Sequence, residues 1–73
     1  MLFDELDVVR VTQAQSGSDP YTGQPVSVPA GQQGTVVVAG GDACDVEFFL
    51  RTASGSPHNA ILIVDNTLLE PAQ

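Results

Sequence analysis

The stretch GQQGTVVVAGGDACDVEFFL, residues 31–50, predicts a β-hairpin and makes this an all-β chain. Residues 35–39 are a β-branched run of the kind that favours a strand. Residues 40–42, Gly-Gly-Asp, have turn chemistry, and residues 44–50 predict the second strand. Gly31 and Gly34 bracket the entry, where glycine indicates a tight turn or a bulge.

The second strand of this hairpin alternates between apolar and charged residues. Successive side chains of a strand point to opposite faces, so we expect one parity in the core and the other in water. A slip of one residue would bury the charges, so the register is well specified. Phe49 breaks the pattern because it shares the face of Asp45 and Glu47, and we expect Val37 of the first strand to point outward, opposite Phe49. The expected core residues are Val9, Val11, Val36, Val38, Val46, Phe48 and Leu50.

The N-terminal segment supplies the first strand and an apolar lead-in. Residues 7–12 predict that strand, with Val9 and Val11 facing inward. Residues 1–6 mix apolar and acidic side chains and are too few for an independent helix. Two alternatives stay open for them, one helical turn or an extended lead-in that lays Phe3 on the core.

Residues 13–30 form a long segment with three prolines, two glycines and no apolar periodicity. Loops of this length in a compact domain are usually functional or disordered. Residues 19–23, Asp-Pro-Tyr-Thr-Gly, have turn chemistry, and Val26 and Val28 alternate in a way that favours a return arm. Three interpretations stay open: a mobile or loosely packed surface loop, a binding loop that presents Tyr21, and an oligomer contact.

Residues 60–65 predict a strand that is apolar on both faces. Its side chains divide into two sets, Ile61 and Ile63 on one face and Leu62 and Val64 on the other. Such a strand is covered on both sides, and a small domain has only one interior. The second cover is the N-terminal segment, the long loop or another subunit. A turn at residues 52–59 precedes this strand, and a short turn that begins at residue 66 follows it.

Several of these motifs together carry a family resemblance. They are Leu6-Asp7-Val8-Val9, Gly31-x-x-Gly34-Thr35-Val36-Val37, Val46-Glu47-Phe48, Gly55 and the late apolar strand. In this arrangement the chain resembles DUF4926, a family of small bacterial proteins of unknown function whose members are similar to SH3-like or KOW-type β-barrels. The resemblance spans nearly the whole chain, which departs from the pattern in a longer first loop and in the lack of lysine. It implies one domain, residues 1–73, folded as a small five-stranded SH3-like barrel with a long first loop and a short 3₁₀ turn before the last strand. It implies no activity.

Length and charge narrow the classes of partner. A chain of 73 residues makes one small domain of marginal stability, for which oligomerisation is a common remedy. Its net charge of −7 argues against nucleic acids and anionic membranes, whose affinity comes from Lys and Arg. The acidity is compatible with a basic protein partner and is also a device for solubility.

The sequence also predicts a cellular compartment. Cys44 is alone, which rules out an internal disulfide and favours a reducing compartment. We find no signal peptide and no membrane-spanning apolar run, so we expect a cytoplasmic protein.

The chemically reactive residues do not form a catalytic or binding signature. Nucleophilic catalysis needs a base within reach of the nucleophile, and we expect Cys44 in the core and His58 in a turn. Asp42, Asp45 and Glu47 surround the hairpin, but they match no known metal-ligand spacing. We therefore expect no enzyme, no catalytic, metal or cofactor site, and no cofactor.

Two function hypotheses from different classes remain. The first is a non-enzymatic protein–protein interaction module that self-associates, with Tyr21 as a candidate loop contact. The alternative is a KOW-like nucleic-acid or ribonucleoprotein accessory domain, a role suggested by fold alone and opposed by the charge. The candidate interface of the first hypothesis consists of Phe49, Val37, Ile61, Leu62, Ile63 and Val64.

Overall fold

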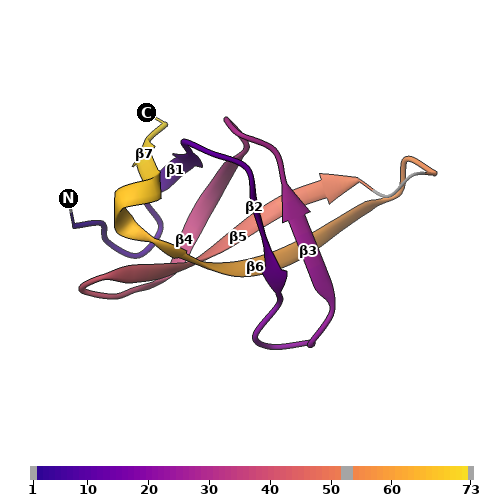
Figure 1. The fold of residues 1–73 in the computed structure, drawn as a ribbon, viewed down its shortest axis with the longest axis horizontal. Helices are drawn as coiled ribbons and strands as arrows, with labels where there is room; N and C mark the ends of the chain where they lie inside the picture. Colours follow the sequence, from indigo (N-terminus) through magenta and orange to yellow (C-terminus); the bar gives the residue numbers. More distant parts are fainter. Residues whose placement is uncertain (1, 52–53, 73) are drawn as a thin grey trace.

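The structure is a computed structural model that describes residues 2–51 and 54–72, and seven strands and one 3₁₀ turn lie within these ranges. In chain order they are β1 Val8–Val11, β2 Gln15–Ser18, β3 Pro25–Val28, β4 Gln33–Ala39, β5 Ala43–Arg51, β6 Pro57–Asp65, the 3₁₀ turn η1 Asn66–Leu68, and β7 Leu69–Pro71. The strands form a five-stranded antiparallel sheet, in the order β6-β5-β4-β1-β7, and a two-stranded hairpin of β2 and β3 (Figure 1). The prediction of an all-β chain is confirmed.

The β4–β5 hairpin is formed as the sequence predicts. Val36 pairs with Val46, and the ladder runs antiparallel on both sides of that pair. Gly31 has a φ of 84°, in the left-handed region, so it forms the tight turn that leads into β4. A Cβ on Gly34 would lie 2.7 Å from Val46 Cγ1, so the second glycine allows β4 to approach β5 closely.

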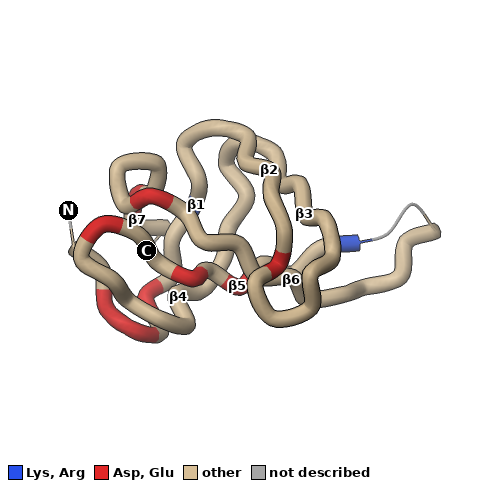
Figure 2. The backbone as a smooth tube through the Cα atoms, turned by 60° about the horizontal axis from the view of Figure 1, so that its bottom comes forward, with Lys and Arg blue, Asp and Glu red and all other residues tan. Residues whose placement is uncertain are grey.

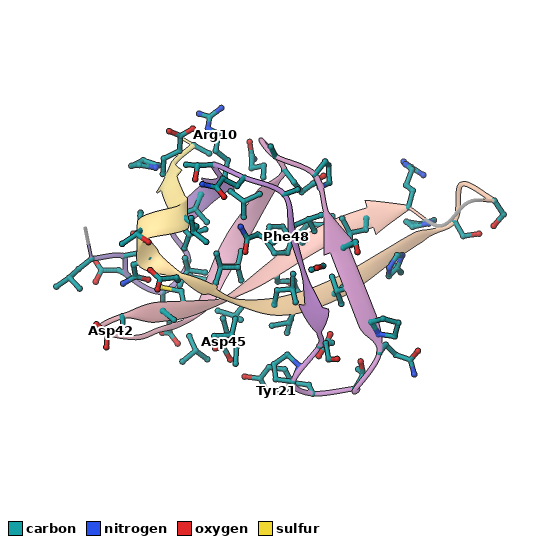
Figure 3. All side chains as sticks on the ribbon, viewed as in Figure 1. Arg10, Tyr21, Asp42, Asp45 and Phe48 are labelled. Atoms are coloured by element: carbon teal, nitrogen blue, oxygen red, sulfur yellow. The ribbon has the colours of Figure 1, made fainter. Side chains whose placement is uncertain are left out.

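The hydrophobic core contains five of the seven predicted residues. Val9, Val11, Val36, Val46 and Phe48 are fully buried. Phe48 is the largest of them and lies near the middle of the molecule in Figure 3, in one core cluster with residues of the large sheet and of the β2–β3 hairpin. The other members come from every part of the chain: Phe3, Val26, Val28, Cys44, Ala60, Leu62, Val64 and Leu69.

The prediction that Val38 is buried is wrong, because 47% of this residue is exposed. The register of β4 shifts between Val36 and Val38, which places Val37 in the ladder as an extra residue. Such a bulge breaks the alternation that the sequence prediction assumed. As a result Val38 pairs with Asp45, a residue of the charged parity, while Val37 is half-buried.

Two further expectations for this hairpin are wrong. Leu50 is only half-buried, because β4 pairs with β5 no further than Phe48 and the ends of β5 and β6 project beyond the sheet (Figure 1). Val37 is not opposite Phe49, because the pairing of Val36 with Val46 places Val37 three or more residues away from Phe49 along the ladder.

The long segment 13–30 contains the β2–β3 hairpin, which packs across β6 (Figure 1). Val26 and Val28 form its return arm, as predicted, and both are buried in the core. The interpretation of this segment as loosely packed is therefore wrong. The N-terminal lead-in contains a turn and no helix in residues 2–7, since Asp7 N donates to the Asp4 carbonyl at 3.1 Å and Leu6 has a φ of 71°. Phe3, with 6% exposed, joins the core, as the second alternative expected.

Strand β6 begins at Pro57, earlier than predicted, so His58 and Asn59 lie in a strand and not in a turn. Residues 52 and 53 of the predicted turn lie outside the described residues. The 3₁₀ turn η1 follows β6, and the side chain of Asp65 caps it by accepting from the backbone N–H of Thr67. In the described part of the chain, no helix is long and apolar enough to cross a membrane.

Candidate interaction face on strands β5 and β6

Strands β5 and β6 divide their side chains between the core and a solvent-facing side, which we call the outer face. Residues directly opposite each other in an antiparallel ladder share a face, so the register assigns the members of this face. They include Thr35 and Val38 on β4, Asp45, Glu47 and Phe49 on β5, and Asn59, Ile61 and Ile63 on β6. Leu62 and Val64 belong to the core, with 4% and 1% exposed, so these two candidate interface residues are not on the surface.

The outer face exposes large apolar side chains. Phe49 is 64% exposed, Ile63 59% and Val38 47%, while Ile61 is half-buried. Val38, Asp45 and Ile63 form one row across three strands, and Phe49 lies opposite Asn59 further along β5. Neither the N-terminal segment nor the long loop buries Phe49 and Ile63, although both were expected as possible covers.

Tyr21 reaches the outer face from the turn between β2 and β3. Its hydroxyl donates to Asp45 Oδ2 at 2.7 Å, and the two side chains meet at the lower edge of the molecule in Figure 3. This hydrogen bond to a carboxylate is the main reason why the pKa of Tyr21 is raised above 10. Tyr21 is 62% exposed and fixed in place, so the predicted loop contact lies beside the predicted interface.

Asp19 fixes the turn that carries Tyr21 to the edge of strand β6. Its Oδ1 accepts from the backbone N–H groups of Tyr21 and Thr22, at 2.8 and 3.2 Å, and its Oδ2 accepts from Ile61 N at 2.9 Å. Asp19 is only 5% exposed, and these backbone donors, Ile61 first, lower its pKa. Nearby, a Cβ on Gly17 would lie 3.2 Å from Leu62 Cδ2, so the hairpin packs closely on the core side of β6.

Cys44 and His58 are not brought together. Cys44 is buried and pairs with Val64, whereas His58 is exposed and pairs with Leu50 at the other end of the ladder. The Cys44 thiol donates to Asn66 Oδ1, with 3.1 Å between the two atoms.

Asn66 closes the β4–β5 turn from inside the protein. Its Nδ2 donates to the carbonyls of Gly40 and Gly41, both at 3.2 Å, and its backbone N–H donates to the Asp42 carbonyl at 2.8 Å. Together with the bond from Cys44, these contacts satisfy a buried amide and give the pair a structural role.

Most acidic segments lie at the end of the molecule that carries the N-terminus and β7, others lie near the middle on β5 and beside the β2–β3 hairpin, and the projecting end of β5 and β6 shows none (Figure 2). Among residues 2–51 and 54–72, no group of three or more His, Cys, Asp or Glu side chains is placed to hold a metal ion. The two arginines lie apart. Arg10 Nε is 3.3 Å from Glu70 Oε1, and Arg51 donates to the Gly55 carbonyl at 2.9 Å. They form no basic stripe of the kind that nucleic-acid binding uses.

Sequence reasoning missed the roles of Asp19 and Asn66. The signal for Asp19 was present, because an Asp at the first position of a Pro-containing turn commonly accepts from backbone N–H groups two residues on. Its second partner, Ile61, is 42 residues away in sequence, so no local sequence pattern indicates the contact.

Comparison of the chain with family models, curated proteins and solved structures gives no match.

Proposed function

We propose that this chain is a non-enzymatic protein–protein interaction module that self-associates through its outer face. The observation that carries this proposal is the exposure of Phe49 and Ile63 on the solvent side of the sheet. Soluble monomers rarely expose large contiguous apolar patches, and such patches commonly mark protein contacts. A two-fold contact would place the same patch of two subunits against each other.

Aromatic residues supply the anchors of the proposed contact. Phe49 and Tyr21 are both more than half exposed, and aromatic side chains are enriched among the residues that dominate binding energy. The bond from Tyr21 to Asp45 fixes one of them before any partner arrives, which reduces the entropy lost on binding. Val38 and Ile63 extend the apolar surface across the sheet.

Charge sets the salt dependence of this contact. Asp45 and Glu47 lie on the outer face, so a two-fold contact brings four carboxylates toward one another. Salt screens such repulsion, with a Debye length of about 10 Å at 0.1 M. Self-association is therefore expected to strengthen with added salt, opposite to a contact made by ion pairs.

The proposed fold is the SH3-like barrel that the resemblance to DUF4926 implies. Three features support it: a five-stranded antiparallel sheet, a hairpin inserted after β1, and a 3₁₀ turn before β7. We also assign the protein to the cytoplasm, since its one cysteine is a buried thiol.

Light scattering coupled to size-exclusion chromatography tests the proposal with two matched variants. Phe49→Glu adds a charge to the outer face and is expected to convert an oligomer into a folded monomer. Leu2→Glu adds the same charge at a residue that is 75% exposed in the N-terminal segment, and it is expected to leave the mass unchanged. A monomeric parent at tens of micromolar, or equal effects of the two variants, would refute the proposal.

A further inference from the structure

Strand β6 is an edge strand of the five-stranded sheet. In an antiparallel ladder, alternate residues direct their N–H and C=O groups toward the neighbouring strand or away from it. Ile61 N donates to the Asp19 side chain and not to β5, so Ile61 is one of the residues that face the edge. The register between β5 and β6 has no shift, so the backbone N–H of Ile63 faces the same edge.

Apart from one covering turn, this edge has little protection against pairing with another chain. Natural edge strands commonly carry charged side chains or bulges, or are covered by another element. Between Pro57 and Asp65 at the two ends of β6, residues 58–64 contain no proline and no Asp, Glu, Lys or Arg, in a chain whose net charge is −7, and their ladder with β5 contains no bulge. The cover is the turn between β2 and β3, which Asp19 holds on the edge at Ile61.

We propose that the turn between β2 and β3, residues 19–24, is an autoinhibitory cover over a strand-pairing site, and that the partner of this site is strand β6 of a second copy. When the Asp19 carboxylate releases Ile61, the edge gains an open row of backbone donors and acceptors. Two β6 strands then pair antiparallel about a two-fold axis and join their sheets into one.

The composition of β6 suits a copy of itself. Antiparallel pairing of residues 57–64 brings no like charges together, although two copies of the whole chain repel each other. Ile61 and Ile63 would meet the same residues of the second strand, and pairs of β-branched side chains stabilise antiparallel strands. This contact forms at the edge of the sheet after Asp19 has released Ile61. It is distinct from the outer-face contact, which forms while the turn covers the edge, and it does not rest on that contact.

Variants in a Phe49→Glu background test the cover while the outer-face contact is disabled. Asp19→Ala removes the acceptor of Ile61 N, and it is expected to double the mass measured by light scattering in a concentration-dependent manner. Amide exchange measured by NMR is expected to slow at Ile63 in that dimer. The control Asp45→Ala removes the bond to Tyr21 and leaves Asp19 in place, so it is expected to stay monomeric with unchanged exchange at Ile63.

A folded monomer of the Asp19→Ala variant overturns the proposal, and so does an oligomer in which Ile63 exchanges as before. If circular dichroism shows that the Asp19→Ala variant is unfolded, the Asp19→Asn variant is tested by the same two criteria. Asparagine keeps one acceptor oxygen for the backbone donors, so it disturbs the turn less than alanine.

Amide exchange in the Phe49→Glu protein itself gives an independent test. The Ile61 amide is expected to exchange at the same rate as the turn amides of Asp19 and Gly23, and faster than the amide of Leu62. Opening of Ile61 only with global unfolding also overturns the proposal. The mass of the Phe49→Glu protein against the parent separately reports on the outer-face contact.

Discussion

Phe48 and Phe49 are neighbours on β5, and they have opposite environments. Phe48 is fully buried in the core, whereas Phe49 is 64% exposed on the outer face. The two residues have the same side chain and the same strand, so the difference comes only from the alternation of a strand between its two faces. Apolar side chains on the core face stabilise the fold, whereas similar side chains on the outer face are exposed to solvent and available for contact with another molecule.

Truncation of the two phenylalanines gives the largest expected contrast. Phe48→Ala is expected to cost about 3–5 kcal/mol of unfolding free energy, because it leaves a cavity in a well-packed core. Phe49→Ala is expected to change stability by less than about 0.5 kcal/mol, as is usual for surface substitutions. Urea denaturation of dissociated protein measures both. Similar losses for the two variants would show that the outer face is packed within one chain.

The second largest difference in stability is expected between two asparagines, the buried Asn66 and the exposed Asn59. Asn66→Ala leaves the carbonyls of Gly40 and Gly41 without their donor, and it is expected to cost about 1–3 kcal/mol. Asn59→Ala is the matched control, because Asn59 is exposed on the outer face opposite Phe49. A loss for Asn66→Ala no larger than the control would contradict the role of this amide in closing the turn.

The contact between Asp19 and the edge of strand β6 is expected to make the stability of the protein depend on acidic pH. Backbone donors lower the pKa of Asp19 in the folded protein, below the value of about 3.9 in the unfolded chain. Its contribution to stability is therefore complete above the unfolded pKa and is lost as pH falls through the folded pKa. Denaturation curves between about pH 2 and pH 6 are expected to show a shallower acid-side slope in Asp19→Asn than in the parent. An unchanged slope would mean that the carboxylate is not held as described.

Tyr21 gives the smallest expected effect and a clean signal, because it is the only tyrosine and the chain has no tryptophan. Its hydrogen bond to Asp45 raises its pKa, so its phenolate absorbance is expected to appear at a higher pH than that of free tyrosine. Asp45→Asn removes the negative charge and is expected to move the midpoint back toward 10. If the parent already titrates near 10, Tyr21 does not reach the outer face.

The sequence predicted those parts of the fold that depend on local alternation. The strands of the β4–β5 hairpin, five core residues and the exposure of Phe49 all follow from the period of two. Val38 was assigned to the wrong face because the bulge next to it changes the parity, and no residue type in the run of valines marks that position.

The candidate face was only partly predictable, because its remaining features depend on contacts distant in sequence. Phe49 and Ile63 were identified from their parity, and Leu62 and Val64 were included although the same parity places them inside. The approach of Tyr21 to Asp45 spans 24 residues, and that of Asp19 to Ile61 spans 42. Turn chemistry indicates how residues 19–23 bend but not which strand they meet.

An intermolecular NOE experiment on a mixture of isotope-labelled and unlabelled chains tests the outer-face contact most directly. At a concentration where light scattering reports an oligomer, cross-peaks are expected from the Phe49 ring of one copy to the methyl groups of Ile63 and Val38 of another. Added salt should strengthen them. A monomeric mass at tens of micromolar, or intermolecular cross-peaks that arise only from Leu2 and Leu6, would contradict the account.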